Sequence, residues 1–99
     1  MRNVVWANSA RDDFLQVLHY IAKDDPDAAQ RVGAEIERTG RALGDYATGH
    51  PGRVTGTYEK SVTGLPYIIA YVLTPDDRTV AIVHVIHAAR DWRDESWPG

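Results

Sequence analysis

Two apolar runs in the last third of the chain decide the fold: Leu65–Val72, with the sequence LPYIIAYV, and Thr79–His87, with the sequence TVAIVHVIH. Both runs are rich in β-branched and aromatic residues, which favour strands. The polar segment between them, PDDR at 75–78, is typical of a tight turn. We therefore expect a β-hairpin with strands at 67–74 and 79–87. The next residues, AARDW at 88–92, bring an arginine and a tryptophan to the exit of the sheet.

A further strand is predicted at 54–62, where the side chains alternate between two faces. One face carries Val54, Gly56, Tyr58, Lys60 and Val62, and the other, more exposed face carries Thr55, Thr57, Glu59 and Ser61. Gly56 indicates a bulge or a close approach of another backbone. The segments 44–52 and 63–66 are rich in turn residues and are expected to be loops.

Two amphipathic helices are predicted before the sheet. The first covers 10–23, with Ser9 as its N-cap and Asp12 in the capping-box position. The second begins after Asp25, an acidic cap followed by proline at the first helical position, and ends near residue 44. Gly33 and Gly40 lie inside this helix and each costs about 1 kcal/mol relative to alanine. Either close packing of the helices requires these glycines, or tertiary contacts offset their weakness.

With a short β-prone run at 4–6, the expected order is β-α-α-β-β-β. This order predicts an α+β fold in which an N-terminal helical hairpin packs on one face of a mostly antiparallel four-stranded sheet. The 99 residues leave no room for a second core, so residues 1–99 are expected to form a single domain.

Composition excludes several classes of protein. The formal charge of −3, from 11 basic and 14 acidic side chains, argues against a polyanion-binding surface. The absence of cysteine excludes disulfides and thiolate zinc sites. No apolar run approaches membrane-spanning length, and the N-terminus is too short and too soon polar for a signal peptide. We therefore expect a cytoplasmic protein with no membrane contact.

The histidines do not predict a metal site. Strand alternation groups His84 with Val80, Ile82 and Ile86, and it groups His87 with Ala81, Val83 and Val85. The two histidines then lie on opposite faces, and no metal or cofactor is expected. For His87 we favour a structural role, hydrogen-bonded to the turn at 90–92, over a role as general base.

Motifs along nearly the whole chain resemble the RelE/ParE toxin superfamily, and its ParE branch in particular. The segments that carry this resemblance are Trp6, SARDDF at 9–14, YIA at 20–22, DPDAA at 25–29, GRV at 52–54, GTYE at 56–59, LPYIIAY at 65–71 and HVIHAARDW at 84–92. Singly each motif is weak, but their order and spacing are fairly specific.

The resemblance implies a toxin of a bacterial type II toxin–antitoxin pair, active in growth inhibition and plasmid stabilisation. A ParD-like antitoxin would hold it inactive in a hetero-oligomer. ParE-like members bind DNA gyrase and block its cycle, whereas RelE-like members cut messenger RNA on the ribosome. A third alternative is a small, non-toxic binding domain of the same fold.

A nuclease needs a proton acceptor, a proton donor and cations around the scissile phosphate. Its candidates here are Arg53, Lys60, His87 and Arg90, a thin set because Lys60 is the only lysine after the helices. RelE-like members carry many more cations on the sheet, and ParE-like members are usually basic at the position of Tyr58. We therefore expect a gyrase inhibitor with no catalytic residue and no direct sequence-specific nucleic-acid binding.

Candidate contacts with the target or the antitoxin come from exposed cations and aromatic residues near the sheet. They are Arg53, Tyr58, Lys60, His87, Arg90, Trp92 and Arg93. Arginine beside tryptophan suits an interface anchor, but the same tail is also consistent with a tryptophan that folds back onto the sheet. Part of the apolar stripe of the helices, with the sheet edge, is a candidate groove for an antitoxin helix or strand.

Overall fold

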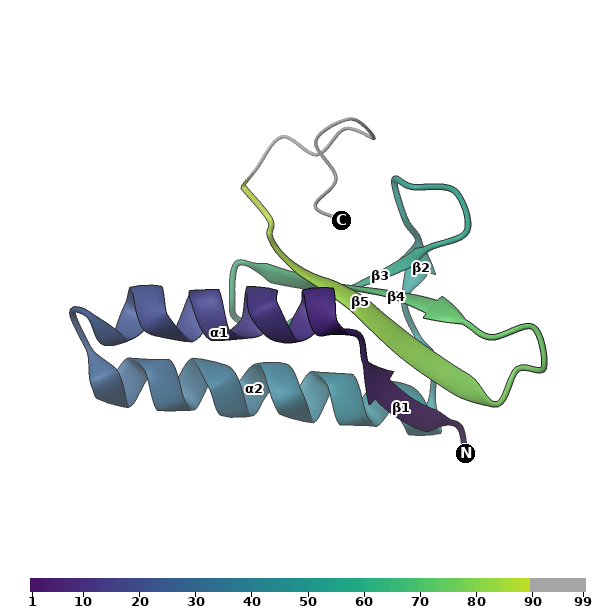
Figure 1. Cartoon of the computed structure of the whole chain (residues 1–99), viewed down its shortest axis with the longest axis horizontal. Helices are drawn as coiled ribbons and strands as arrows, with labels where there is room; N and C mark the ends of the chain where they lie inside the picture. Colours follow the sequence, from purple (N-terminus) through teal and green to yellow (C-terminus); the bar gives the residue numbers. More distant parts are fainter. Residues whose placement is uncertain (90–99) are drawn as a thin grey trace.

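The fold is α+β, as the sequence predicts, with two helices lying along one face of a sheet (Figure 1). The computed structural model describes residues 1–89. In this part of the chain the elements are β1 (Asn3–Trp6), α1 (Asn8–Ala22), α2 (Pro26–Asp45), β2 (His50–Pro51), β3 (Tyr58–Ser61), β4 (Tyr67–Leu73) and β5 (Thr79–His87).

The sheet order is β1-β5-β4-β3-β2, and β1 is parallel to β5 while the other pairs are antiparallel. The helical hairpin and the mostly antiparallel sheet are confirmed, but the described residues form five strands rather than four. None of the helices within residues 1–89 is both long enough and apolar enough to span a bilayer.

The expected strand at 54–62 is wrong in its first half. Only Tyr58–Ser61 is a strand, and it pairs with the additional strand β2, so that His50 lies opposite Glu59. Residues 52–57 turn the chain back between β2 and β3. The Gly52 N–H donates to the Thr57 carbonyl at 2.8 Å, and Gly56 has a φ of 87°, which favours glycine. Gly56 therefore makes a turn, not a bulge.

The main core lies between the helices and the sheet, and the glycines of α2 allow the elements to approach. A Cβ atom at Gly33 would lie 3.1 Å from the Leu18 side chain of α1. At Gly40 it would lie 3.0 Å from both Ile82 and Trp6. Close packing of the two helices is therefore the correct interpretation for Gly33, whereas Gly40 packs against the sheet and not against the other helix.

The predicted cap of α2 is confirmed, and that of α1 is wrong. The Asp25 carboxylate accepts a hydrogen bond from the Ala28 N–H at 3.0 Å, with Pro26 as the first helical residue. By contrast, α1 begins at Asn8, and no side chain caps it. The Ser9 hydroxyl instead donates to the Val83 carbonyl of β5 at 2.7 Å. A tertiary bond to the sheet therefore replaces the expected local cap.

Side chains of α1 bind the edge of β5 beyond the end of β1. β1 stops at Trp6, opposite Ile82, so no strand pairs with the rest of this edge. Asp13, one helical turn after Ser9, accepts from the Val85 N–H at 3.1 Å, and its carboxylate lies 2.9 Å from Nδ1 of His84. Since buried backbone groups need partners, α1 satisfies part of the edge that β1 leaves uncovered.

A β-bulge at Val83 changes the faces that β5 presents. Tyr71 lies opposite Ile82 and Ala70 lies opposite His84, so Val83 has no partner in the register. As a result Val80, Ile82 and Val85 join the core on the helix side, whereas Val83 and Ile86 pack with Ile68 and Ala70 in a second cluster. The expected grouping of His84 with Val80 and Ile82, and of His87 with Val83, is therefore wrong. After the bulge His84 lies on the same face as Ile86, and His87 lies on the same face as Val85. The two histidines therefore still point to opposite faces of the sheet.

The turn between β4 and β5 is fixed by short polar contacts. The Thr74 hydroxyl donates to the Asp76 carboxylate at 2.6 Å, and the Arg78 N–H donates to it at 3.2 Å. These bonds, the one from Thr74 first, lower the pKa of Asp76. Asp77 has a φ of 62° and forms an ion pair with Arg2 at 2.7 Å, which joins the turn to the N-terminus.

Replacing Asp13 tests the role of α1 at the edge of β5. We expect Asp13→Ala to lower the free energy of unfolding by about 1–3 kcal/mol, because the Val85 N–H then loses its acceptor. Denaturant unfolding measures this change. The matched control is Asp12→Ala, which alters an exposed neighbour on the same helix. Equal stability of the two variants would contradict the proposed role.

Candidate functional site

The segment 49–57, which we call the Arg53 loop, includes β2, which pairs with β3, and side chains of the sheet bind it at two further points. The Gly49 N–H donates to the hydroxyl of Tyr71 on β4 at 2.9 Å. The Arg53 N–H donates to the carboxylate of Glu59 on β3 at 2.9 Å. Within the loop, the Thr57 hydroxyl donates to the Val54 carbonyl at 2.6 Å. The loop is therefore held by side chains of neighbouring strands as well as by its own turn.

Tyr71 is buried at the first attachment point, and Tyr58 stacks on it with ring centroids 5.6 Å apart. Burial raises the pKa of Tyr71, and the hydrogen bond from Gly49 only partly opposes this effect. The resemblance to ParE-like proteins implies a basic residue at position 58. Here the residue is Tyr58, whose ring packs on the buried Tyr71. Tyr67 and Tyr71 are both buried.

Glu59 is a buried carboxylate that the sequence does not reveal. Strand alternation places it on the more exposed face of β3, yet it is only 4% exposed. The Nε atom of Arg53 lies 3.8 Å from its carboxylate, and the Arg53 side chain is 42% exposed. The chain turns at 52–57 and returns over the strand, so the burial comes from the loop. The alternation of side chains along β3 cannot reveal a contact that is made by another segment of the chain.

The structure does not bring Arg53 and Lys60 to the same side of the sheet. Lys60 is half-buried opposite Ile69, whose side chain belongs to the core on the helix side. Glu59, which holds Arg53, lies opposite Ala70 of the second cluster. Arg53 and Lys60, two of the four residues suggested for a nuclease, are therefore associated with opposite faces of the sheet.

His87 lies opposite Tyr67 at the start of β4, whereas the Arg53 loop is attached to Tyr71, further along the same strand. Its ring meets the edge of Tyr67 with centroids 5.4 Å apart, and its Nδ1 accepts from the Ala89 N–H at 3.1 Å. Tyr67 and Tyr71 are four residues apart, or about 13 Å along a strand. His87 also borders a pocket of about 550 Å³, together with Asp13, Gln16, Val17, Tyr20, Tyr67 and Val85. Arg90, Trp92 and Arg93 lie outside the described residues.

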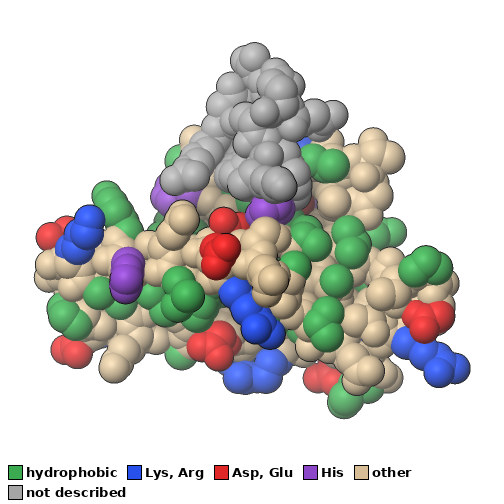
Figure 2. All heavy atoms as spheres, in the orientation of Figure 1, with side chains coloured by type: hydrophobic (Ala, Val, Ile, Leu, Met, Phe, Trp, Pro, Cys, Tyr) green, Lys and Arg blue, Asp and Glu red, His purple; other side chains and the backbone are tan. Residues whose placement is uncertain are grey.

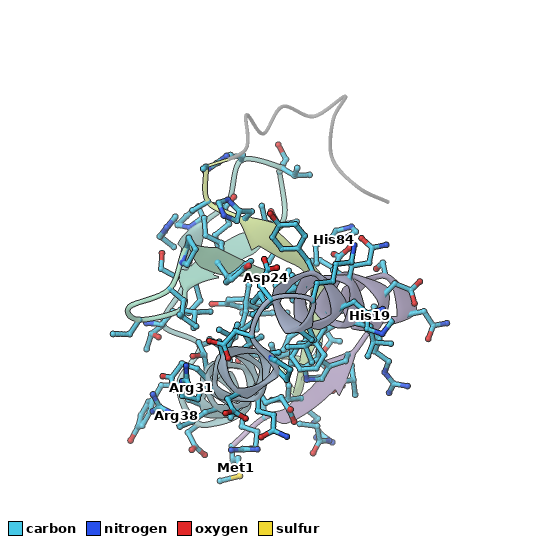
Figure 3. All side chains as sticks on the ribbon, turned by 90° about the vertical axis from the view of Figure 1, so that its left-hand side faces the viewer. Met1, His19, Asp24, Arg31, Arg38 and His84 are labelled. Carbon is cyan, nitrogen blue, oxygen red and sulfur yellow. The ribbon has the colours of Figure 1, made fainter. Side chains whose placement is uncertain are left out.

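The other histidines are far from forming a common site. His19 is exposed on α1, whereas His84 is buried at the sheet (Figure 3). Within residues 1–89, no three side chains of histidine, aspartate or glutamate lie close enough together to hold a metal ion.

A second candidate surface is a groove of about 420 Å³ on the helical hairpin, beside β1. Its lining combines apolar and charged side chains: Trp6, Arg11, Phe14, Leu15, Glu37 and Arg41. Leu15 is 57% exposed, and the ring of Trp6 meets that of Phe14 edge-on with centroids 5.7 Å apart. Figure 2 shows hydrophobic side chains and cations together on the face that carries the helices and β1. We call this the hairpin groove.

The comparisons with known proteins agree with the fold. A family model described as the ParE toxin of the type II toxin–antitoxin system parDE matches residues 4–92. A curated protein of Sinorhizobium fredii with the name "Putative toxin Y4kP" is 40% identical over 92 residues, which are 92% of this chain and 93% of that protein.

Two solved structures share the fold. A chain of the chromosomal ParDE system from P. aeruginosa has a TM-score of 0.77 and 19% identity, over 88% of this chain and 96% of that one. A chain of the RelBE2 toxin–antitoxin complex from Mycobacterium tuberculosis has a TM-score of 0.59 and 25% identity, over 87% of this chain and 96% of that one.

Removing the Tyr71 hydroxyl tests the first attachment of the Arg53 loop. We expect Tyr71→Phe to destabilise the protein by about 1 kcal/mol and to speed hydrogen exchange at the Gly49 amide, because this N–H loses its acceptor. Tyr58→Phe is the matched control, since the Tyr58 ring stacks without a hydrogen bond from the loop. Unchanged exchange at Gly49 in Tyr71→Phe would contradict the attachment.

The same variant gives a pH signature. Because the pKa of Tyr71 is higher in the folded than in the unfolded state, its contribution to stability is complete below the usual tyrosine value of about 10. This contribution to stability is lost as the pH rises through the pKa that Tyr71 has in the folded protein. The stability difference between the wild type and Tyr71→Phe should therefore shrink at alkaline pH.

Proposed function

Since the chain belongs to the ParE toxin family, whose model matches residues 4–92, we propose that it is a toxin that inhibits DNA gyrase by binding to it. In this proposal the toxin acts in the cytoplasm and performs no chemistry of its own. The observation that supports it best is the separation of the residues that a nuclease would use.

General acid–base cleavage of RNA requires its groups to reach the same phosphate. Among the described candidates, His87 contacts Tyr67 at the start of β4, and Arg53 is held by Glu59 on β3, which lies opposite Ala70 in the middle of β4. Lys60 lies on the opposite face of the sheet from Glu59. Such dispersed groups are better suited to contacts across a protein surface than to one catalytic centre.

A second candidate function is ribosome-dependent cleavage of messenger RNA. The likeness to a chain of the RelBE2 complex, at 25% identity and a TM-score of 0.59, favours it. The higher TM-score of 0.77 with the ParDE chain and the match of the ParE family model favour the gyrase proposal.

Two assays run side by side separate these functions. We expect the purified toxin to block supercoiling by DNA gyrase and to leave messenger RNA intact in a translation reaction with ribosomes. Induction without the antitoxin should also cause filamentation and an SOS response, because blocked gyrase leaves broken DNA. Cleaved message with normal supercoiling would reject the gyrase proposal in favour of the nuclease.

The neutralising partner in this proposal is a ParD-like antitoxin that docks in the hairpin groove and forms a hetero-oligomer with the toxin. The similar structures come from a ParDE system and a RelBE2 complex. The groove combines apolar side chains with two arginines, Arg11 on α1 and Arg41 on α2, and one carboxylate, Glu37. This chemistry suits an amphipathic segment that carries apolar anchors and carboxylates.

Charge reversal in the groove tests this docking. We expect Arg11→Glu combined with Leu15→Glu to weaken binding of the antitoxin encoded next to the toxin by at least about tenfold, because an apolar anchor and a complementary charge are lost. Calorimetric titration measures the affinity. Arg31→Glu is the control, since Arg31 projects from α2 away from α1 and does not line the groove (Figure 3). Equal affinity of the two variants would place the antitoxin elsewhere.

A further inference from the structure

The Glu59 carboxylate is buried beside an exposed arginine. Its side chain is 5% exposed, compared with 42% for Arg53, and the two residues are joined by the Arg53 N–H and by the approach of Nε. A buried carboxylate is costly unless hydrogen bonds and an opposite charge offset its desolvation. In the described part of the chain, both of the groups that offset this cost come from Arg53.

The backbone around Arg53 is also closely confined. A Cβ atom at Gly49 would lie 2.6 Å from the Tyr71 hydroxyl and 2.7 Å from the Glu59 carbonyl. At Gly52 it would lie 2.5 Å from the Thr57 hydroxyl and 3.2 Å from the Glu59 carboxylate. Both positions therefore require glycine, and the loop lies directly on the two anchoring side chains. Arg53 extends from a backbone with little freedom to shift.

We propose that Glu59 is a positioning residue, which fixes Arg53 so that its guanidinium meets a carboxylate on the protein that the toxin inhibits. This inference rests on the proposed function, because it requires a protein target, but not on that target being gyrase. Glu59 itself is buried and makes no contact with the target in this arrangement.

The geometry of the pair determines which partner Arg53 suits. Because Nε faces Glu59, the two terminal nitrogens of the guanidinium are left for an external acceptor. The described residues provide no hydrogen-bond acceptor for these terminal nitrogens. A guanidinium held by its Nε side presents a planar fork that matches a carboxylate.

A protein carboxylate suits this loop better than a nucleic acid. Binding to a phosphate backbone draws on several cations spread along the surface. Arg53 is the only arginine or lysine among residues 49–57, and the whole chain has a formal net charge of −3. One oriented arginine can instead form a single, directional contact with an aspartate or glutamate of a protein partner.

A double-mutant cycle between Glu59 and Arg53 tests the inference. The variants are Arg53→Ala, Glu59→Gln and the combination of both, with Thr55→Ala as the control on the same loop. Glu59→Gln keeps an amide oxygen that can accept from the Arg53 N–H, but it removes the charge that orients Nε. For each protein the readouts are growth arrest on induction, the concentration that halves gyrase supercoiling, and the thermal midpoint.

We expect Arg53→Ala to raise the half-inhibitory concentration by about tenfold, as for the loss of one charge-assisted contact. Glu59→Gln should weaken inhibition in the otherwise wild-type protein, but it should cause no further loss once Arg53 has been replaced. Arg53→Lys should restore little, since lysine lacks the fork. Thr55→Ala should behave as the wild type.

Additive losses in the double variant would overturn the inference, because they would show that Glu59 acts through the fold and not through Arg53. Full inhibition by Arg53→Ala would overturn it as well. If Glu59→Gln lowers the thermal midpoint too far for the assay, Glu59→Asp replaces it in the same cycle, since its shorter carboxylate withdraws from Nε. Failure of the wild type to inhibit gyrase would reject the proposed function alone, and growth arrest would then measure the same coupling between Glu59 and Arg53.

Discussion

β5 has to satisfy its backbone on two edges, although the strand beside one of them is only four residues long. β1 pairs with Thr79–Ile82 and then gives way to α1, while β4 continues along the opposite edge to His87. The helix satisfies part of the uncovered edge through Ser9 and Asp13, which lie on the same side of α1 one turn apart. The position of α1 over the sheet therefore depends on backbone hydrogen bonding as well as on apolar packing.

The same strand also decides which side chains reach each face. The bulge at Val83 moves Val85 and His87 to the helix side, and it leaves Ile86 with Ile68 and Ala70 on the other. Buried side chains therefore lie on both faces of the sheet, and Glu59 is buried opposite Ala70 on the second. On this face the Arg53 loop folds over β3, so the arrangement of the core and that of the proposed contact surface are linked.

The sequence predicts the elements of this fold well where local signals act alone. Asp25 and Pro26 mark the start of α2, and the apolar runs mark β4 and β5 within one residue. The errors occur where a distant segment intervenes. Ser9 is a good cap by type, but the Val83 carbonyl competes for its hydroxyl. Alternation through 54–62 looks like one strand, but a left-handed Gly56 and two hydrogen bonds to Val54 turn the chain instead. Arg53 was predictable as an exposed cation, whereas the burial of Glu59 depends on that turn.

We propose that this ParE-family toxin acts by binding its target and not by turnover. A titration of the purified toxin against a fixed amount of DNA gyrase tests this claim most directly, with residual supercoiling as the readout. Inhibition by binding predicts that activity falls in proportion to added toxin and is lost only when toxin and gyrase are present in comparable amounts. Complete loss of supercoiling at a small fraction of the gyrase concentration, increasing with time of incubation, would show turnover and contradict the account.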